Sequence, residues 1–124
     1  MIRLVTCDID GTLLHGEETS IDAETLEEIR RLREKGILFC PASGRQYHSL
    51  RRLFAQVQDE IAYICENGSV VFGPGNPGPV WGKVPLERNL AVQLCRDIMA
   101  MPECEINASG ENTCYVSVSY THLR

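Results

Sequence analysis

The sequence predicts an α/β fold with a parallel sheet, and two observations lead to this prediction. Three short apolar runs, residues 2–7, 37–40 and 62–65, have the length and composition of buried strands. Between them, residues 22–36 and 46–58 carry apolar side chains at helical spacing. Strands that alternate with amphipathic helices form βαβ units with right-handed crossovers, and the sheet that results is parallel.

The bulk properties of the chain exclude several classes of partner. The chain has 124 residues and a formal net charge of −5, so it has no basic excess that could neutralise the phosphates of a nucleic acid. No apolar segment is long enough to span a membrane, and the first apolar run is too short for a signal peptide. The six cysteines are dispersed without a C-x-x-C pair, which is typical of a reduced, cytoplasmic protein. The oligomeric state is left open by the sequence.

The first apolar run is followed by residues 8–14, D-I-D-G-T-L-L. A strand that ends here would place Asp8 and Asp10 at its carboxyl end on the same side of the chain, and Gly11 permits a tight turn after them. Two such carboxylates suit a hard cation such as Mg²⁺, and they offer a nucleophile and an acid/base group. The alternative is an ordinary strand-to-turn junction, where Asp and Gly are common.

The next elements are a helix, a strand and a turn. Asp22 is the expected N-cap of the helix over residues 22–36, and Gly36 is its expected stop. The run at 37–40 is then expected to be a fully buried strand, because all four of its residues are apolar. Residues 41–45 are expected to form the turn that leads into the second helix.

Ser43, Gly44 and Arg45 are candidate phosphate-binding residues in this turn. A hydroxyl and successive turn amides at a strand-to-helix junction suit an anion, and Arg45 adds a charged, bidentate donor. The alternative is a Ser-Gly turn with a surface arginine. The position after the second strand, on the same sheet edge as Asp8 and Asp10, favours the phosphate interpretation.

The second helix, expected over residues 46–58, leads to the third strand and to the turn Glu66-Asn67-Gly68. Asn67 is a candidate binding residue, although Asn-Gly is first of all a turn signal. Ligands of parallel α/β sheets bind beyond the carboxyl ends of the strands. We therefore expect the turns at 8–11, 41–45 and 66–68 to converge on one edge of the sheet.

The composition changes at the Gly/Pro-rich segment 73–79, which is expected to be a loop. Residues 69–72 and 80–83 on either side of it are expected to pair as a hairpin. Beyond them, apolar spacing over residues 86–98 predicts a third helix that ends near Pro102.

The last part of the chain is expected to begin a second, α+β unit. Residues 103–108 and 113–119 read as two strands joined by the polar residues 109–112. Residues 117–124 continue no recognisable pattern and are interpreted as non-native sequence, similar to translated adapter read-through.

The three polar motifs together resemble the Cof-like branch of the haloacid dehalogenase (HAD) superfamily, which carries a class IIB cap. Residues 8–14 match its motif I, residues 42–45 its motif II, and residues 66–68 its N-G turn. The resemblance covers nearly all of residues 1–116. It implies an incomplete Rossmann-like core of three layers, α/β/α, over residues 1–82, followed by the beginning of a cap domain over residues 83–124.

The resemblance also implies a function. It implies a Mg²⁺-dependent phosphatase that hydrolyses a small phosphorylated metabolite, a sugar phosphate or a cofactor phosphate, through an aspartyl-phosphate intermediate. By this resemblance Asp8 is the nucleophile, Asp10 is the acid/base, and Asp8 and the carbonyl of Asp10 hold Mg²⁺. Ser43 would bind the transferring phosphoryl group, and Arg45 and Asn67 would shape the substrate side of the site.

The sequence also departs from the family pattern. Family members are longer and supply a motif III lysine and an acidic G-D-x-x-x-[ND] motif IV, and Lys35 and Lys83, the only lysines, do not fit the former. We therefore expect an N-terminal piece of a longer hydrolase, with little or no turnover of its own. The alternatives are a phosphomutase or sugar-phosphate phosphatase of a neighbouring HAD branch, and a non-catalytic remnant that binds phosphate or metal.

Overall fold

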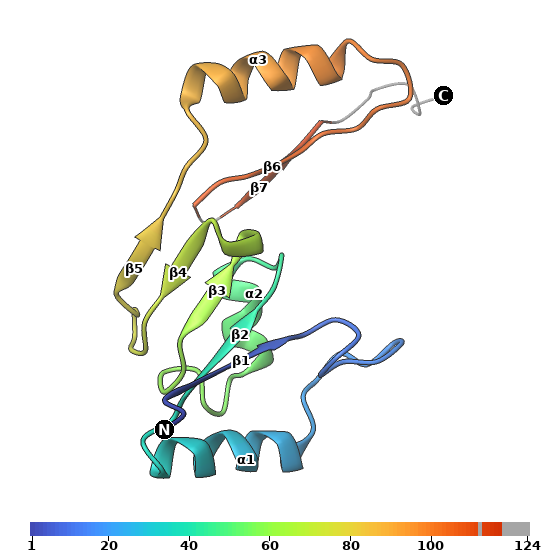
Figure 1. Cartoon of the computed structure of the whole chain (residues 1–124). Helices are drawn as coiled ribbons and strands as arrows, with labels where there is room; N and C mark the ends of the chain where they lie inside the picture. The colour runs from blue at the N-terminus through green and yellow to red at the C-terminus, as the bar shows by residue number, and fades with distance from the viewer. Residues whose placement is uncertain (112, 118–124) are drawn as a thin grey trace. The chain divides into compact units, whose positions relative to one another are not determined.

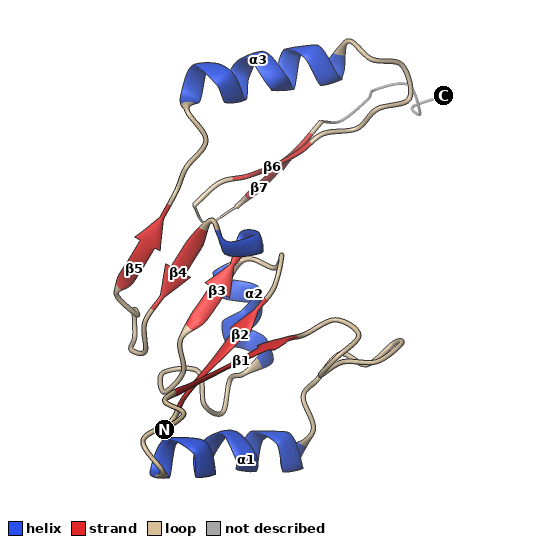
Figure 2. Ribbon diagram, in the orientation of Figure 1, coloured by secondary structure: helices blue, strands red, loops and turns tan. Residues whose placement is uncertain are grey.

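The computed structural model describes residues 1–111 and 113–117. The chain divides into two compact units, Met1–Val84 and Pro85–Arg124. Figure 1 follows the chain through both units, and Figure 2 separates helices from strands. Among the described residues, no helix combines the length and the apolar character that crossing a bilayer requires.

The first unit is a five-stranded mixed sheet with two α-helices. Its elements in chain order are β1 (Leu4–Asp8), α1 (Ala23–Glu34), β2 (Leu38–Ala42), α2 (Tyr47–Leu53), β3 (Tyr63–Cys65), the 3₁₀ turn η1 (Glu66–Gly68), β4 (Val70–Phe72) and β5 (Val80–Lys83). The strand order is β1-β2-β3-β4-β5, parallel from β1 to β3 and antiparallel from β3 to β5. The predicted βαβ units and the predicted hairpin around the Gly/Pro loop are therefore confirmed.

Both helices of this unit pack into one hydrophobic cluster. Leu26 and Ile29 of α1 and Leu50 of α2 join strand residues such as Phe39 and Tyr63 in this cluster, and all five are buried. Alternate residues of a strand point to opposite faces of the sheet, so a single face supplies the strand side of the core. The sheet and these helices are two of the three layers of the predicted α/β/α arrangement.

The helix α1 has the predicted ends. The Asp22 side chain accepts a hydrogen bond from the Thr25 N–H at 2.8 Å, as expected of an N-cap. Gly36 follows the helix with a φ of 72°, in the left-handed region where glycine carries no Cβ penalty. Local signals in the sequence therefore define this helix.

The second strand is longer than the sequence indicated. Its parallel register with β1 continues through Cys7–Pro41 to Asp8–Ala42, so the turn begins only at Ser43. The expectation that the strand ends at Cys40 was wrong, because pairing with β1 keeps Pro41 and Ala42 extended.

The second helix is shorter than the sequence indicated. It ends at Leu53, and the expected continuation to residue 58 is replaced by tight turns. Phe54 and Val57 are nevertheless almost fully buried, and the Val57 N–H donates to the Phe54 carbonyl at 2.9 Å. The apolar spacing therefore marked core positions correctly, although a series of turns rather than a helix presents them.

The second unit contains α3 (Arg88–Met99) and a two-stranded antiparallel sheet of β6 (Asn107–Ser109) and β7 (Cys114–Val116). The predicted helix and strand pair are present, but both strands are shorter than expected. Glu103 has a φ of 62°, which a strand cannot accommodate, so β6 begins later than predicted. Residues 118–124, most of the segment interpreted as non-native, lie outside the described residues.

Candidate active site

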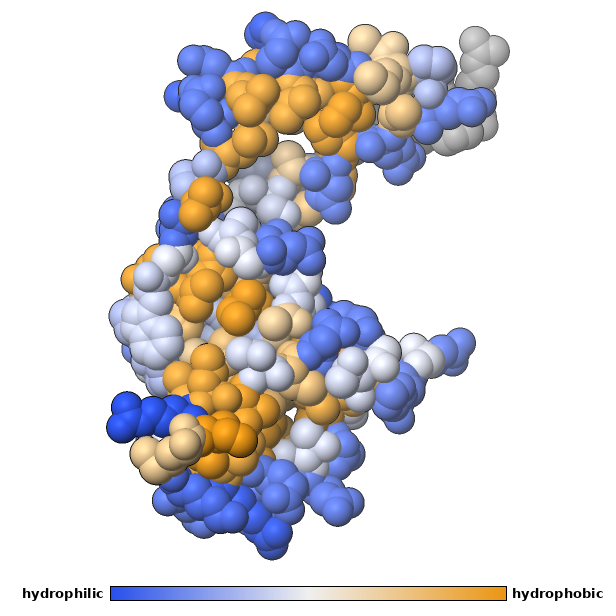
Figure 3. Space-filling model, in the orientation of Figure 1, coloured by the Kyte–Doolittle hydropathy of each residue, from blue (hydrophilic) through white to orange (hydrophobic). Residues whose placement is uncertain are grey.

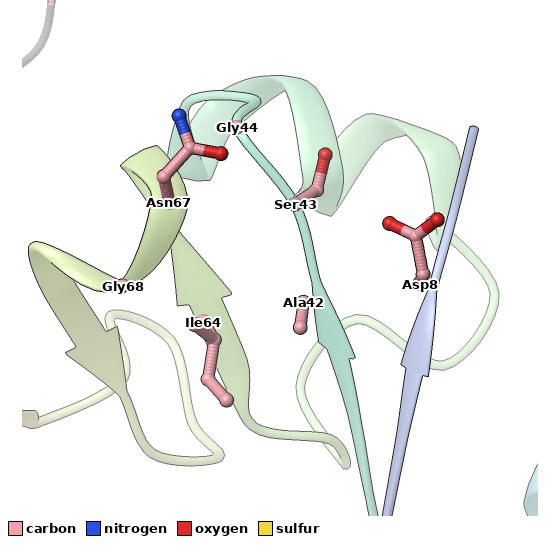
Figure 4. A pocket seen from close by; sticks show the side chains of 7 residues that line it. All are labelled: Asp8, Ala42, Ser43, Gly44, Ile64, Asn67 and Gly68. Carbon is pink, nitrogen blue, oxygen red and sulfur yellow. The ribbon is translucent and has the colours of Figure 1, made fainter.

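The carboxyl ends of the three parallel strands meet at one cavity. Asp8 at the end of β1 is in register with Ala42 at the end of β2, and Ala42 pairs with Ile64 of β3. A cavity of about 300 Å³ opens here (Figure 4), lined by Asp8, Ala42, Ser43, Gly44, Ile64, Asn67 and Gly68. The structure thus brings together one residue or more from each of the three predicted turns.

The turn after β1 is built around a buried isoleucine. Ile9 is fully buried between the exposed residues Asp8 and Asp10, and its carbonyl accepts hydrogen bonds from the N–H groups of three following residues, 12–14. Gly11 has a φ of 89°, which lets the chain reverse within this tight turn. The alternation of buried and exposed residues therefore presents both carboxylates to solvent.

Asp8 has a hydrogen-bond donor of its own within this turn. The Thr12 hydroxyl donates to Asp8 Oδ2 at 3.4 Å, a long hydrogen bond that links the last strand residue to the turn. Thr12 lies in the motif that the sequence singled out, but no role was predicted for its side chain. The sequence signal that could have indicated this contact is the spacing of four residues between Asp8 and Thr12.

Asp10 faces Arg45 instead of the cavity. Arg45 Nε donates to Asp10 Oδ2 at 3.1 Å, and a terminal guanidinium nitrogen of Arg45 donates to Oδ1 at 2.6 Å. These hydrogen bonds lower the pKa of the Asp10 carboxyl below its usual value and raise the pKa of Arg45. The structure therefore joins Asp10 to motif II, while neither Asp10 nor Arg45 lines the cavity.

Backbone hydrogen bonds join the turn at 43–45 to the third strand and its turn. The Ser43 N–H donates to the Ile64 carbonyl at 3.0 Å, and the Asn67 N–H donates to the Ser43 carbonyl at 3.1 Å. The Ser43 hydroxyl oxygen accepts from the Arg45 N–H at 3.1 Å. The phosphate-binding candidates are therefore held by main-chain contacts that do not depend on a ligand.

The turn after β3 has a backbone that few residues adopt. Glu66, Asn67 and Gly68 have φ values of 52°, 54° and 92°, three successive residues in the left-handed region. Left-handed backbone costs about 1–2 kcal/mol for a residue with a side chain, and Asn is among the residues that tolerate it best. The alternative interpretation of Asn67 as a turn former is therefore confirmed. The same residue also lines the cavity, and its role in binding stays a prediction.

The Asn67 side chain lies directly against the backbone of Gly44. A Cβ atom at position 44 would be 3.0 Å from Asn67 Oδ1 and 3.2 Å from Nδ2. A side chain at position 44 would therefore push the Asn67 amide away by a few tenths of an ångström, although the φ of Gly44 is not in the left-handed region. The sequence indicated a glycine turn here, but no sequence signal could have identified Asn67 as the neighbour.

The residues of the first turn fit a magnesium ion in part. The Asp8 carboxylate lines the cavity and is the hard oxygen ligand that Mg²⁺ prefers. Both carboxylate oxygens of Asp10 accept a hydrogen bond from Arg45, which offsets the negative charge of this carboxylate, so the main-chain carbonyl of Asp10 is the candidate ligand for a cation. Within residues 1–111 and 113–117, no group of three or more His, Cys, Asp or Glu side chains gathers around a common point.

Cys7 lies next to Asp8 but is a poor nucleophile. Burial raises the pKa of the Cys7 thiol, the neighbouring Asp8 raises it further, and the thiol donates to the Asp8 carbonyl at 3.3 Å. The interpretation of Cys7 as a core residue agrees with its packing against the hydrophobic cluster.

Comparison with known proteins places this fold and site in a family. Residues 5–122 match the model of the haloacid dehalogenase-like hydrolases. The chain is 31% identical over 119 residues to YbjI, a 5-amino-6-(5-phospho-D-ribitylamino)uracil phosphatase of Escherichia coli, covering 96% of this chain and 43% of the relative. It is 40% identical over 73 residues to phosphoglycolate phosphatase 1 of Saccharolobus solfataricus, covering 58% of this chain and 32% of the relative.

A crystal structure from Eubacterium rectale matches with a TM-score of 0.80 and 34% identity, covering 93% of this chain and 43% of that one. The chain thus spans less than half the length of the relatives that it matches. The motifs on which the sequence resemblance rested, residues 8–14, 42–45 and 66–68, all lie within the matched residues. The chain belongs to the haloacid dehalogenase-like hydrolases.

Proposed function

We propose that this chain carries the nucleophile half of a Mg²⁺-dependent phosphatase, which hydrolyses a small phosphorylated metabolite through an aspartyl-phosphate on Asp8. The observation that supports this most strongly is the shared cavity. It brings the Asp8 carboxylate together with Ser43, Gly44 and Asn67, from the ends of three neighbouring strands. A nucleophile beside hydroxyl and amide donors is the arrangement that phosphoryl transfer requires.

The chemistry proposed for these residues has two steps. In the first, a carboxylate oxygen of Asp8 attacks phosphorus, the bond from phosphorus to the leaving oxygen breaks, and Asp10 gives that oxygen a proton. For this step Asp10, a carboxylate paired with Arg45 outside the cavity lining, would first have to take up a proton and turn toward the leaving oxygen. In the second, Asp10 takes a proton from a water molecule that attacks the aspartyl-phosphate, which frees Asp8 and phosphate. Ser43, Gly44 and Asn67 hold the phosphoryl oxygens during both steps.

The site also needs positive charge, because a phosphate dianion repels the Asp8 carboxylate. The Asp8 carboxylate and the main-chain carbonyl of Asp10 are the residues that would hold Mg²⁺. When bound, this ion neutralises the charge of the phosphoryl oxygens. The hydrogen bond from Thr12 to Asp8 Oδ2 is long, at 3.4 Å, so it leaves the Asp8 carboxylate available to a metal ion.

The part of the site that this chain supplies has the size of a small-ligand cavity. Its volume of about 300 Å³ is at the low end of the range of ligand pockets. The two curated relatives named above are phosphatases of phosphorylated small molecules. We therefore propose a sugar phosphate or a phosphorylated cofactor or its precursor as the substrate class of the whole protein.

Thermal unfolding of the 124-residue chain tests this proposal without requiring turnover. Trifluoroberyllate with Mg²⁺ mimics the phosphoryl group on an aspartate, so we expect it to raise the melting temperature. A ligand at 100 times its dissociation constant adds about 2.7 kcal/mol to the free energy of unfolding. The Asp8→Asn variant should lose this stabilisation, whereas Asp97→Asn on α3, outside the residues that line the cavity, should keep it.

Two results would contradict the proposal. One is an equal stabilisation of the Asp8→Asn variant, which would indicate anion binding without an aspartyl-phosphate. The other is stabilisation by trifluoroberyllate to the same extent with and without Mg²⁺, which would exclude the metal from the site.

A further inference from the structure

We propose that Arg45 is a positioning residue, which holds the Asp10 side chain in one orientation and does not bind the substrate phosphate. The inference rests on the proposed function, because Asp10 is the acid/base group there. The family resemblance had placed Arg45 on the substrate side of the site. The contacts of its guanidinium group point to a different role.

The geometry of the Arg45–Asp10 pair is a bidentate fork. Two nitrogens of one guanidinium edge donate to the two oxygens of one carboxylate, at 3.1 Å and 2.6 Å. Such a fork fixes the plane of the carboxylate as well as its distance, which a single hydrogen bond does not. The two side chains are 36% and 58% exposed, and exposed ion pairs matter mainly when their geometry is bidentate.

The main chain of Arg45 makes hydrogen bonds on both sides of its Cα atom. Its N–H donates to the Ser43 hydroxyl oxygen at 3.1 Å, and its carbonyl accepts from the Glu66 N–H at 3.2 Å. The second contact comes from the first of the three left-handed residues after β3. A side chain that starts from a fixed backbone loses less freedom when it pairs, so this anchoring favours the fork.

The cavity itself argues against a phosphate-binding role for Arg45. The polar side chains that line it are those of Asp8, Ser43 and Asn67, and the Arg45–Asp10 pair lies outside the lining residues as a unit. Asp10 occupies the guanidinium edge formed by Nε and one terminal nitrogen, which is one of the two edges that can bind a phosphate bidentately. Binding a phosphate through that edge would therefore require the Asp10 pair to break.

Nuclear magnetic resonance of the ¹⁵N-labelled chain tests the inference. The Arg45 Nε–H signal is assigned by its loss in the Arg45→Lys variant. We expect Asp10→Asn to shift this signal, because a neutral amide cannot complete the fork. Asp59→Asn is the matched control, because Asp59 pairs with Arg51: it should shift the Arg51 signal and leave that of Arg45 unchanged.

Addition of Mg²⁺ and trifluoroberyllate then separates the two roles of Arg45. A positioning residue keeps its Nε–H signal in place while the backbone amide signals of Ser43, Gly44 and Asn67 shift. A shift of the Arg45 signal comparable to that caused by Asp10→Asn would overturn the inference. If neither set of signals responds, the proposed function fails, and the response to Asp10→Asn still decides whether Arg45 holds Asp10.

A measurement on the unaltered chain covers the case in which Asp10→Asn fails to fold. Rotation about the Nε–Cζ bond of Arg45 should be at least about threefold slower than in the exposed Arg52, because rotation breaks both hydrogen bonds of the fork. Equal rotation rates for the two arginines would show that the fork does not persist, and the inference would then be wrong.

Discussion

The helices α1 and α3 form in the same way but are buried to different extents. Each has 12 residues and an acidic N-cap whose side chain accepts backbone hydrogen bonds, Asp22 for α1 and Glu87 for α3. The helix α1 buries Leu26 and Ile29, whereas α3 has no buried residue. Figure 3 shows apolar side chains gathered along one side of α3. Leu90 and Leu94 of this helix are exposed.

The comparison separates the formation of a helix from its burial. Caps and apolar spacing are properties of a few neighbouring residues, so both helices have them. Burial requires a second surface, and the sheet of the first unit provides one for α1 through its contacts with β2. Most helical stability in proteins comes from such packing, so the two helices should respond differently to the same substitutions.

The largest expected difference comes from removing one leucine side chain from each helix. Leu26→Ala opens a cavity in the core of the first unit and should lower its free energy of unfolding by about 2–5 kcal/mol. Leu94→Ala removes an exposed side chain and should change it by less than about 0.5 kcal/mol. Urea unfolding followed by the fluorescence of Trp81, in β5, measures both. Similar losses for the two variants would show that α3 is packed as well as α1.

Alkaline pH should destabilise the first unit. Burial raises the pKa of the Cys65 thiol from 9.0 to about 12, and burial also raises the pKa of the Tyr63 phenol. The unfolded chain then loses these protons first, so the stability is complete below about pH 9 and is lost as the pH rises toward 12. For Cys65 the loss should reach about 2.7 kcal/mol near pH 11, measured by urea unfolding at a series of pH values.

The Cys65→Ala variant is the control for the alkaline effect. Its stability should decline less steeply above pH 9, since only Tyr63 and the remaining buried groups then contribute. An unchanged slope in this variant would mean that the Cys65 thiol ionises as readily in the folded chain as in the unfolded one.

Thiol reactivity should also distinguish the two units. Cys40 and Cys65 are buried in the first unit, whereas Cys104 and Cys114 are exposed in the second. The thiolate is the reactive form, and a reagent must also reach it, so iodoacetamide should modify the exposed pair at least about tenfold faster. Mass spectrometry of peptides from a time course measures the four rates. Equal rates under native conditions would contradict the burial of Cys40 and Cys65.

The smallest expected difference concerns the two helix caps. Asp22→Ala should lower the urea midpoint of the first unit, because α1 contributes to its core. Glu87→Ala should reduce the helical circular dichroism signal of α3 and leave that midpoint unchanged, because α3 has no buried residue. A shift of the midpoint by Glu87→Ala would show that the stability of the first unit depends on α3.

Much of this fold could be predicted because its signals are local. The ends of α1 follow from Asp22 and Gly36, and the hairpin follows from the Gly/Pro loop at residues 73–79. The ends of β2 and α2 could not be predicted from spacing alone. The register with β1 extends β2 to Ala42, and turns that still bury Phe54 replace the last part of α2.

Some features of the candidate site could likewise be predicted from the sequence, and others could not. The sequence by itself determined which turns carry chemistry, because the strand ends of a parallel sheet must share one edge. It also determined that Asp8 lies at the carboxyl end of a strand and that Gly11 reverses the chain. These features depend on residues within a few positions of one another, and the structure has both of them.

Only the tertiary structure decided the partners of these residues. Arg45 pairs with Asp10 across 35 positions of sequence, and the Asn67 side chain packs on Gly44. Such contacts depend on how β1, β2 and β3 align, and that alignment places residues that no short sequence pattern relates. The same physical reason explains why α1 has buried residues and α3 has none. Apolar spacing is a property of the sequence of each helix, but the surface that buries the apolar side chains comes from the fold.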